Sequence, residues 1–303
     1  MPTWNGIQKE INESGIQHAQ LASSSVDIVR RKYLKQLHTH TGRNIIAYYS
    51  GFQSKPGIMQ SSINDEDKNG FMSAIHGLDR SKGLDLILHT PGGSFAATQS
   101  IVDYLRRMFG RDIRAIVPQS AFSGGTIIAC SCKSIVMGKE SNLGPVDPQL
   151  AGVPAYGVIE EFKRAYKEIK ADPAKISIWQ PIIQQYRPTF LTQCENSIKW
   201  SKQFLKEQLE EVMFYRSKNK STSISKIVRN LTDYSKGHDR HIHIDECKDM
   251  GLKIEELETD QKLQDLVLTV HHCYMHVFMN LPAYKITENQ KGVAIIKNIK
   301  TNN

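Results

Sequence analysis

Two pairs of adjacent glycines are the residues best placed to do chemistry in this sequence, in the segments Pro91-Gly92-Gly93-Ser94 and Ser123-Gly124-Gly125. Adjacent glycines let a backbone approach a ligand closely and turn its amides outward. A nucleophilic serine needs a tight strand-to-helix turn that exposes its oxygen, with N–H donors beside it for the oxyanion. Ser123 fits the first need. The amides of Gly93 and Gly124 fit the second.

Two other uses of such turns compete with nucleophilic catalysis. Serine is a frequent N-cap residue of helices, and glycine-rich turns before a helix also bind phosphate. Neither glycine pair continues into the Gly-Lys-Ser/Thr of a P-loop or completes a dinucleotide fingerprint. The local pattern alone therefore leaves a nucleophile, a cap and an anion-binding turn all open.

The elements around these turns predict a parallel sheet. Apolar runs at residues 84–89, 113–117 and 134–137 are typical of buried strands, and helical patterns fill residues 94–109 and 124–132 between them. Strands that alternate with helices indicate βαβ units with right-handed crossovers. Both glycine turns follow strands, so we expect them at the carboxyl edge of the sheet, where open α/β folds place their sites.

The remaining chain surrounds this α/β centre with helices. We expect an N-terminal helical arm at residues 1–40, one α/β domain with a helical C-terminal half at residues 41–290, and a C-terminal tail at residues 291–303. A further strand is predicted at residues 44–50. No linker rich in glycine, serine or proline divides the chain.

Composition limits the class of protein. The 303 residues carry a net charge of +8, but their basic side chains alternate with acidic ones, which favours a solvated surface and no nucleic-acid partner. Five cysteines, an odd number with only Cys130 and Cys132 close together, suit a reducing compartment. No secretory signal and no apolar stretch long enough for a bilayer are visible. We therefore expect a cytoplasmic protein without a membrane span.

Four segments, in order, resemble a known family. They are residues 41–51, 83–93, 117–126 and 136–149, and a weaker match runs from His271 through Ala283-Tyr284-Lys285-Ile286. Together they resemble the serine dehydrogenase proteinase family, relatives of the Clp protease subunit and of signal peptide peptidase A. The order of four motifs makes the resemblance specific, although no single motif would.

This resemblance implies a Clp/crotonase fold of repeated βαβ units and a serine endopeptidase that acts on proteins or peptides. It implies that Ser123 is the nucleophile and that Gly93 and Gly124 form the oxyanion hole. It also implies a homo-oligomer, in which the helical parts of the chain make the contacts. No cofactor is expected. Histidines gather between His238 and His243, but zinc needs three or four converging ligands, so we expect no metal either.

The general base departs from the Clp pattern. In the Clp subunit a histidine follows the nucleophile helix, whereas the corresponding stretch here has Asp147, and no histidine occurs between His89 and His238. Asp147 either orients the base or braces its loop. Signal peptide peptidases use a Ser-Lys dyad, and a lysine base needs burial to lower its pKa.

We choose Lys167 as the candidate base, because it lies on a predicted amphipathic helix, where we expect it to be buried in part. The alternatives are three nearby lysines and two distant histidines: Lys163, Lys170, Lys175, His238 and His241.

Two other function classes stay open. The same fold hosts acyl-CoA enzymes, whose two backbone amides hold a thioester enolate and do not need Ser123. A non-catalytic scaffold of the same fold is the third class.

Overall fold

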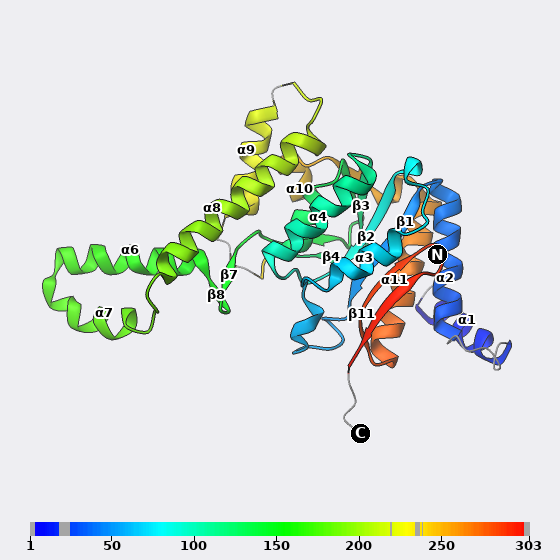
Figure 1. Ribbon diagram of the computed structural model, residues 1–303, viewed down its shortest axis with the longest axis horizontal. Helices are drawn as coiled ribbons and strands as arrows, with labels where there is room; N and C mark the ends of the chain where they lie inside the picture. The colour runs from blue at the N-terminus through cyan, green and yellow to red at the C-terminus, as the bar shows by residue number, and fades with distance from the viewer. Residues whose placement is uncertain (1–3, 18–24, 219, 234–236, 238, 300–303) are drawn as a thin grey trace.

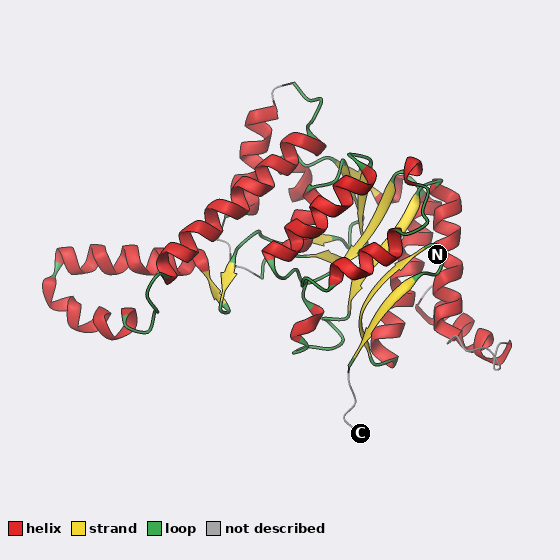
Figure 2. Ribbon diagram, viewed as in Figure 1, coloured by secondary structure: helices red, strands yellow, loops and turns green. Residues whose placement is uncertain are grey.

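A mixed sheet forms the centre of the computed structural model, which describes residues 4–17, 25–218, 220–233, 237 and 239–299. In this described part the main sheet has seven strands in the order β10-β5-β3-β2-β1-β11-β12 (Figures 1 and 2). The first five run parallel: β1 (Asn44–Ser50), β2 (Leu84–His89), β3 (Ile113–Val117), β5 (Ser134–Met137) and β10 (Ile254–Glu256). The antiparallel strands β11 (Ala283–Asn289) and β12 (Ala294–Asn298) complete it.

The two central strands are buried on both faces, as their apolar runs predict. Every residue of β1 and β2 is buried. Because successive side chains of a strand point to opposite faces, β1 contributes to two separate cores. Ile46 and Tyr48 pack into one, and Ile45, Ala47 and Tyr49 pack into the other.

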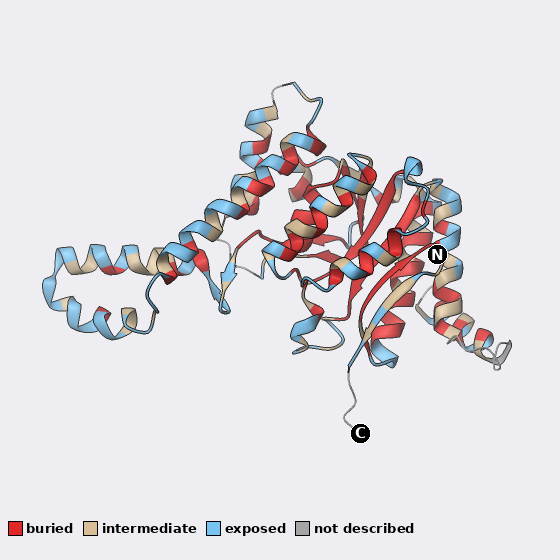
Figure 3. Cartoon of the chain, viewed as in Figure 1, coloured by how far each residue is buried: buried red, intermediate tan, exposed pale blue. Residues whose placement is uncertain are grey.

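Helices cover both faces of the sheet. On one side lie α3 (Asp67–Ile75), α4 (Phe95–Phe109) and α5 (Gly124–Cys130), and on the other lie α2 (Ser25–Thr41) and α11 (Gln261–Asn280). Figure 3 shows the buried strands between these two layers. The mainly parallel sheet and its crossover helices agree with the α/β architecture predicted from the sequence.

The ends of the chain are more closely integrated than their polar sequences indicated. In the expected N-terminal arm, α1 (Trp4–Gln17) and α2 pack on α11, and Ile7, Leu34 and Leu37 are completely buried there. The expected C-terminal tail contains β12, which pairs with β11. The open edge of β11 supplies the backbone partners that make residues 294–298 a strand.

A helical projection extends away from the sheet. It consists of α6 (Ala155–Ala171), α7 (Ile176–Ile183) and the first part of α8 (Phe190–Gln208), at the left of Figure 1. A small separate core of Ala155, Val158, Phe190 and Cys194 holds α6 against α8. The rest of α8 returns to the main domain, where α9 (Lys220–Leu231) and α10 (Ile244–Met250) follow. Figure 3 shows that most of this projection is exposed.

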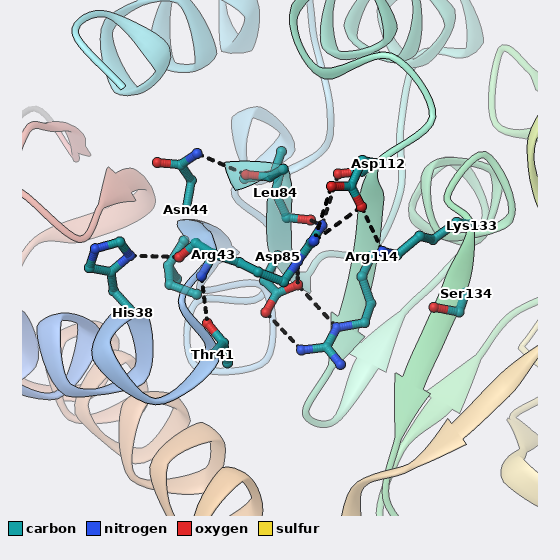
Figure 4. Close-up of polar contacts among 12 residues, drawn as sticks. His38, Thr41, Arg43, Asn44, Leu84, Asp85, Asp112, Arg114, Lys133 and Ser134 are labelled. Atoms are coloured by element: carbon teal, nitrogen blue, oxygen red, sulfur yellow. Dashed lines mark hydrogen bonds and ion pairs between the residues drawn. The ribbon is translucent and has the colours of Figure 1, made fainter. Parts of the chain in front are cut away.

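A cluster of ion pairs joins the strands near their amino ends (Figure 4). Asp85 on β2 is fully buried and accepts hydrogen bonds from Arg43 Nε at 2.7 Å and from Arg114 Nη2 at 2.8 Å. Arg43 also binds the Asp112 carboxylate, which pairs in turn with Lys133 at 2.6 Å. One buried carboxylate therefore balances two arginines from neighbouring elements, at the end of the sheet opposite the glycine turns.

Replacing Asp85 by asparagine should destabilise the fold, because the two guanidinium groups lose the charge between them. We expect Asp85→Asn to lower the free energy of unfolding by about 2–4 kcal/mol. This loss is somewhat smaller than usual for a broken buried ion pair, because each arginine keeps another acidic partner. Urea denaturation measures this change. Asp103→Asn, an exposed site on α4, is the control and should change stability by less than about 0.5 kcal/mol. Equal stabilities of the two variants would contradict this role of Asp85.

Candidate active site

The two glycine turns lie side by side at the carboxyl edge of the sheet. Strand β2 leads into Thr90, and β3 leads into the short strand β4 (Ser120–Ala121). The Thr90 N–H donates to the Ser120 carbonyl at 3.0 Å, and the Phe122 N–H donates to the Thr90 carbonyl at 3.0 Å. These two bonds fix the turn that contains Ser123 against the turn that contains Gly92 and Gly93.

Ser123 itself has a strained backbone. Its φ of +50° and ψ of −109° fall in a region that residues with a side chain rarely adopt. Such a conformation costs on the order of 1–3 kcal/mol and persists only where the surrounding structure imposes it. Ser123 occupies the N-cap position of α5, yet its side chain makes no capping hydrogen bond. The helix-cap interpretation of this serine is therefore not supported.

The Gly93 amide is directed by its neighbour Ile63. The Ile63 N–H donates to the Gly92 carbonyl at 2.7 Å, and the Ser94 N–H donates to the Ile63 carbonyl at 2.9 Å. Gly93 lies between Gly92 and Ser94, and Ile63 is its partner in this parallel bridge. In such a bridge the N–H of the middle residue points away from the partner strand. The Gly93 N–H therefore faces away from Ile63.

The opposite side of this loop is where Ser123 and Gly124 lie. A Cβ atom placed on Gly92 would come within 2.7 Å of the Ser123 Cβ, and one placed on Gly124 would lie 3.5 Å from the Gly93 nitrogen. Among the described residues, neither the Gly93 nor the Gly124 N–H donates to another backbone group. The arrangement thus presents two amides beside one serine.

A cavity of about 520 Å³ opens in front of these groups. Its walls include Asp147, which is 7% exposed, and apolar side chains from three helices and a loop. The Val146 N–H donates to the Leu231 carbonyl at 2.7 Å, so the end of α9 holds the loop that carries Asp147. The lining residues most relevant to a ligand are Ser123, Gly93, Gly124, Asp147, Phe95, Ile127, Val146 and Trp200.

The structure does not bring Lys167 to this cavity. Lys167 is exposed on α6, in the helical projection, because the buried side of α6 is formed by Val158 and Ala165. The partial burial expected for Lys167 is not found. The other lysines of this region do not line the cavity either: Lys163 is exposed and pairs with Glu160, Lys170 is exposed, and Lys175 pairs with Glu168.

His241, in contrast, lies close to the serine turn. It precedes β9 (Ile242–His243), which pairs with β6 (Asn142–Leu143), and β6 pairs with β4. This small sheet places the His241 ring 4.9 Å from the ring of Phe122, the residue before Ser123. His241 is exposed, so its ring is accessible. His238, the other candidate histidine, lies outside the described residues.

His89 packs behind the glycine turn, next to Phe52, a residue that the sequence analysis did not identify. The ring of Phe52 lies 5.0 Å from that of His89 and 6.2 Å from that of Phe122. His89 is fully buried, and this burial lowers its pKa to about 3. A group with so low a pKa is a weak base at neutral pH. Only the folded contacts identify Phe52, because no motif marks it.

In the residues that the structure describes, no group of three or more histidine, cysteine, aspartate or glutamate side chains gathers in a way that could hold a metal ion. His276 on α11 stacks on Trp4, with 3.8 Å between ring centroids. No helix in this part of the chain combines the length and the apolar composition that crossing a bilayer requires.

A strained serine beside two glycine amides, at the carboxyl edge of a mainly parallel sheet, combines the two parts that a serine hydrolase needs, a hydroxyl nucleophile and N–H donors for the oxyanion. Comparison with known families agrees with this class. The family described as ClpP-like SDH-type serine proteinase matches residues 16–291, and the chain belongs to this family. The resemblance drawn from the four sequence segments is therefore confirmed, and so is the Clp-like fold.

Two curated relatives come from Methanocaldococcus jannaschii, and both are described as uncharacterized proteins. One is 30% identical over 243 residues, which cover 79% of this chain and 78% of the relative. The other is 27% identical over 230 residues, which cover 74% of this chain and 71% of the relative. Neither description states an activity, so the chemistry has to be argued from the site.

Proposed function

We propose that this chain is a cytoplasmic serine endopeptidase that cleaves proteins or peptides through an acyl-enzyme on Ser123. The observation that carries the proposal is the strained Ser123 turn, with the amides of Gly93 and Gly124 beside it at the mouth of a cavity. Membership of a serine proteinase family supports the same reaction. All five cysteines are buried and free, which suits a reducing compartment.

The reaction would proceed in two stages. Ser123 Oγ attacks the carbonyl carbon of the peptide bond while a base accepts its proton. The Gly93 and Gly124 N–H groups donate to the oxyanion of the tetrahedral intermediate. The C–N bond then breaks, and the protonated base gives its proton to the leaving amine. Water, deprotonated by the same base, hydrolyses the ester and restores the Ser123 hydroxyl.

For the base we infer His241 in preference to Lys167. The support is positional: the His241 ring, just before β9, lies 4.9 Å from the ring of Phe122, the residue before Ser123, whereas Lys167 lies on the helical projection. Both side chains are exposed, and neither lines the cavity. Asp147 is buried in the cavity wall, where a carboxylate can orient a histidine ring or brace the loop. A Ser-Lys dyad with Lys167 remains the competing assignment.

The acyl-CoA enzyme and the non-catalytic scaffold are less well supported. Both could keep the two glycine amides, but neither needs a serine held at a positive φ beside them. Reaction with a fluorophosphonate separates these classes, since it requires an activated serine. Tight binding of an acyl-CoA without such labelling would favour the acyl-CoA enzyme.

The first prediction for this function concerns Ser123. Ser123→Ala should abolish fluorophosphonate labelling and lower the rate of peptide or ester hydrolysis by at least about 10³-fold, because the attacking oxygen is lost. Circular dichroism should show an unchanged fold. Ser221→Ala, at an exposed site of α9, is the matched control and should keep full activity. Turnover by Ser123→Ala at the rate of the control would disprove the acyl-enzyme mechanism.

A second prediction distinguishes the two bases. His241→Gln should lower the hydrolysis rate by about 10²–10⁴-fold, the usual contribution of general-base catalysis, and Lys167→Met should leave it nearly unchanged. An inactive Lys167→Met variant with an active His241→Gln variant would establish the dyad instead.

The homo-oligomer remains a proposal, and we place its contacts on the projection rather than on the N-terminal helices. The N-terminal helices pack onto α11 of their own chain, whereas Tyr166, Ile176 and Ile178 on α6 and α7 are more than half exposed. Exposed apolar groups of this kind favour contacts between copies with closed symmetry.

Light scattering at micromolar concentration should therefore detect an oligomer. The double variant Ile176→Ser with Ile178→Ser should shift it to the monomer, since it removes the apolar contact and leaves the main core untouched. Val293→Ser, an exposed apolar site in the turn between β11 and β12, should not change the mass. A monomeric wild-type protein at physiological salt would exclude this assembly.

A further inference from the structure

A fully buried lysine lies outside the cavity, in the segment Ala283-Tyr284-Lys285-Ile286 of β11. The side chain of Lys285 is 1% exposed. Its ammonium group donates to Asp67 Oδ2 at 2.8 Å, to Asp67 Oδ1 at 3.0 Å and to the Ser62 carbonyl at 2.7 Å. Burial lowers the pKa of Lys285, and the neighbouring Asp67 opposes that shift. The lysine thus meets the burial condition for a base, yet its protons are directed to Asp67 and to a backbone carbonyl.

Asp67 gathers contacts from several parts of the fold. It begins α3, its side chain is 1% exposed, and it accepts hydrogen bonds from the Tyr48 hydroxyl at 2.8 Å and from the Asn64 N–H at 3.0 Å. Lys297 on β12 provides a second cation, with Nζ 3.1 Å from Asp67 Oδ1. These partners fix the orientation of the buried Asp67 carboxylate.

The two charged groups hold both sides of Ile63. Lys285 binds the carbonyl of Ser62, the residue before Ile63, and Asp67 binds the N–H of Asn64, the residue after it. Ile63 is in turn the residue whose backbone brackets Gly93 with two hydrogen bonds. A continuous path of direct contacts therefore leads from the buried ion pair to the loop that presents the Gly93 amide.

We propose that Lys285 and Asp67 are positioning residues, which fix Ile63 and thereby aim the Gly93 N–H at the oxyanion. The proposal rests on the peptidase function proposed above. Neither side chain lines the cavity, so neither touches a substrate. Their effect should appear in the transition state, where the negative charge forms on the oxygen, and much less in the binding of the uncharged substrate.

Lys285→Met tests the proposal, since methionine keeps the apolar stem and removes the ammonium group. Asp67 retains Lys297 as a counter-ion in this variant, so its carboxylate is not left without a cation. We expect kcat per active site to fall by about 10–100-fold with KM within about 3-fold of the wild-type value, less than the 10²–10³-fold loss of an entire oxyanion donor. Lys297→Met is the matched control, because Lys297 contacts Asp67 but not Ser62, and its kcat should stay within about 2-fold.

A pair of inhibitors separates positioning from a general loss of structure. A peptide aldehyde forms an adduct that bears the oxyanion, and the corresponding peptide alcohol does not. Lys285→Met should weaken the aldehyde by the same factor as kcat/KM and leave binding of the alcohol unchanged. If this variant does not fold, Asp67→Asn provides the second test, with the same pattern and an expected loss of about 3–10-fold.

Three results would overturn the inference. The first is a kcat of Lys285→Met equal to that of Lys297→Met, and the second is an equal loss of affinity for the aldehyde and the alcohol. In both cases the wild-type protein still hydrolyses peptides, so the proposed function survives. The third is a wild-type protein without hydrolysis or fluorophosphonate labelling, which removes the proposed function and this inference with it.

Discussion

The pairing of Ile63 with the backbone on either side of Gly93 is the contact on which the site depends. A Cβ atom on Gly93 would lie 2.3 Å from the Ile63 nitrogen and 2.4 Å from its carbonyl oxygen, so only glycine permits the approach. This approach directs the Gly93 amide toward Ser123. The two backbone hydrogen bonds of Thr90, with Ser120 and Phe122, hold the serine turn against the glycine turn. The sheet beneath carries both turns on adjacent parallel strands, and its ion pairs lie at the other end.

The site is assembled from segments that are far apart in the chain. The β2 and β3 turns supply Gly93 and Ser123, while the pairing of β9 with β6 brings His241, the proposed base, close to Phe122 from more than a hundred residues further on. A short hairpin of residues 149–154 leads from the loop of Asp147 into the helical projection, which returns through α8, and α8 contributes Trp200 to the cavity wall. The helices between Ser123 and β9 thus separate these groups in sequence, while the fold keeps them close in space.

The local parts of this arrangement were predictable from the sequence. Short apolar runs define β2, β3 and β5, and small residues mark the turns that follow them, so the sheet, Ser123 and both glycines could be placed. Patterns that need distant partners could not. The amphipathic period of α6 does not tell which side faces the core, and so the exposure of Lys167 was missed. Nothing local shows that two residues of β9 pair with β6, or that Lys285 meets Asp67.

The position of Lys285 on β11 has a consequence for synthesis of the protein. Strand β11 inserts beside β1 and carries the lysine that contacts the Ser62 segment, although both β1 and Ser62 are made more than two hundred residues earlier. A chain still growing on the ribosome has Ser123 and both glycine turns long before this strand emerges. If the lysine aims the oxyanion donor, nascent chains remain poor catalysts until their last strands are in place, which protects them and their neighbours from premature cleavage.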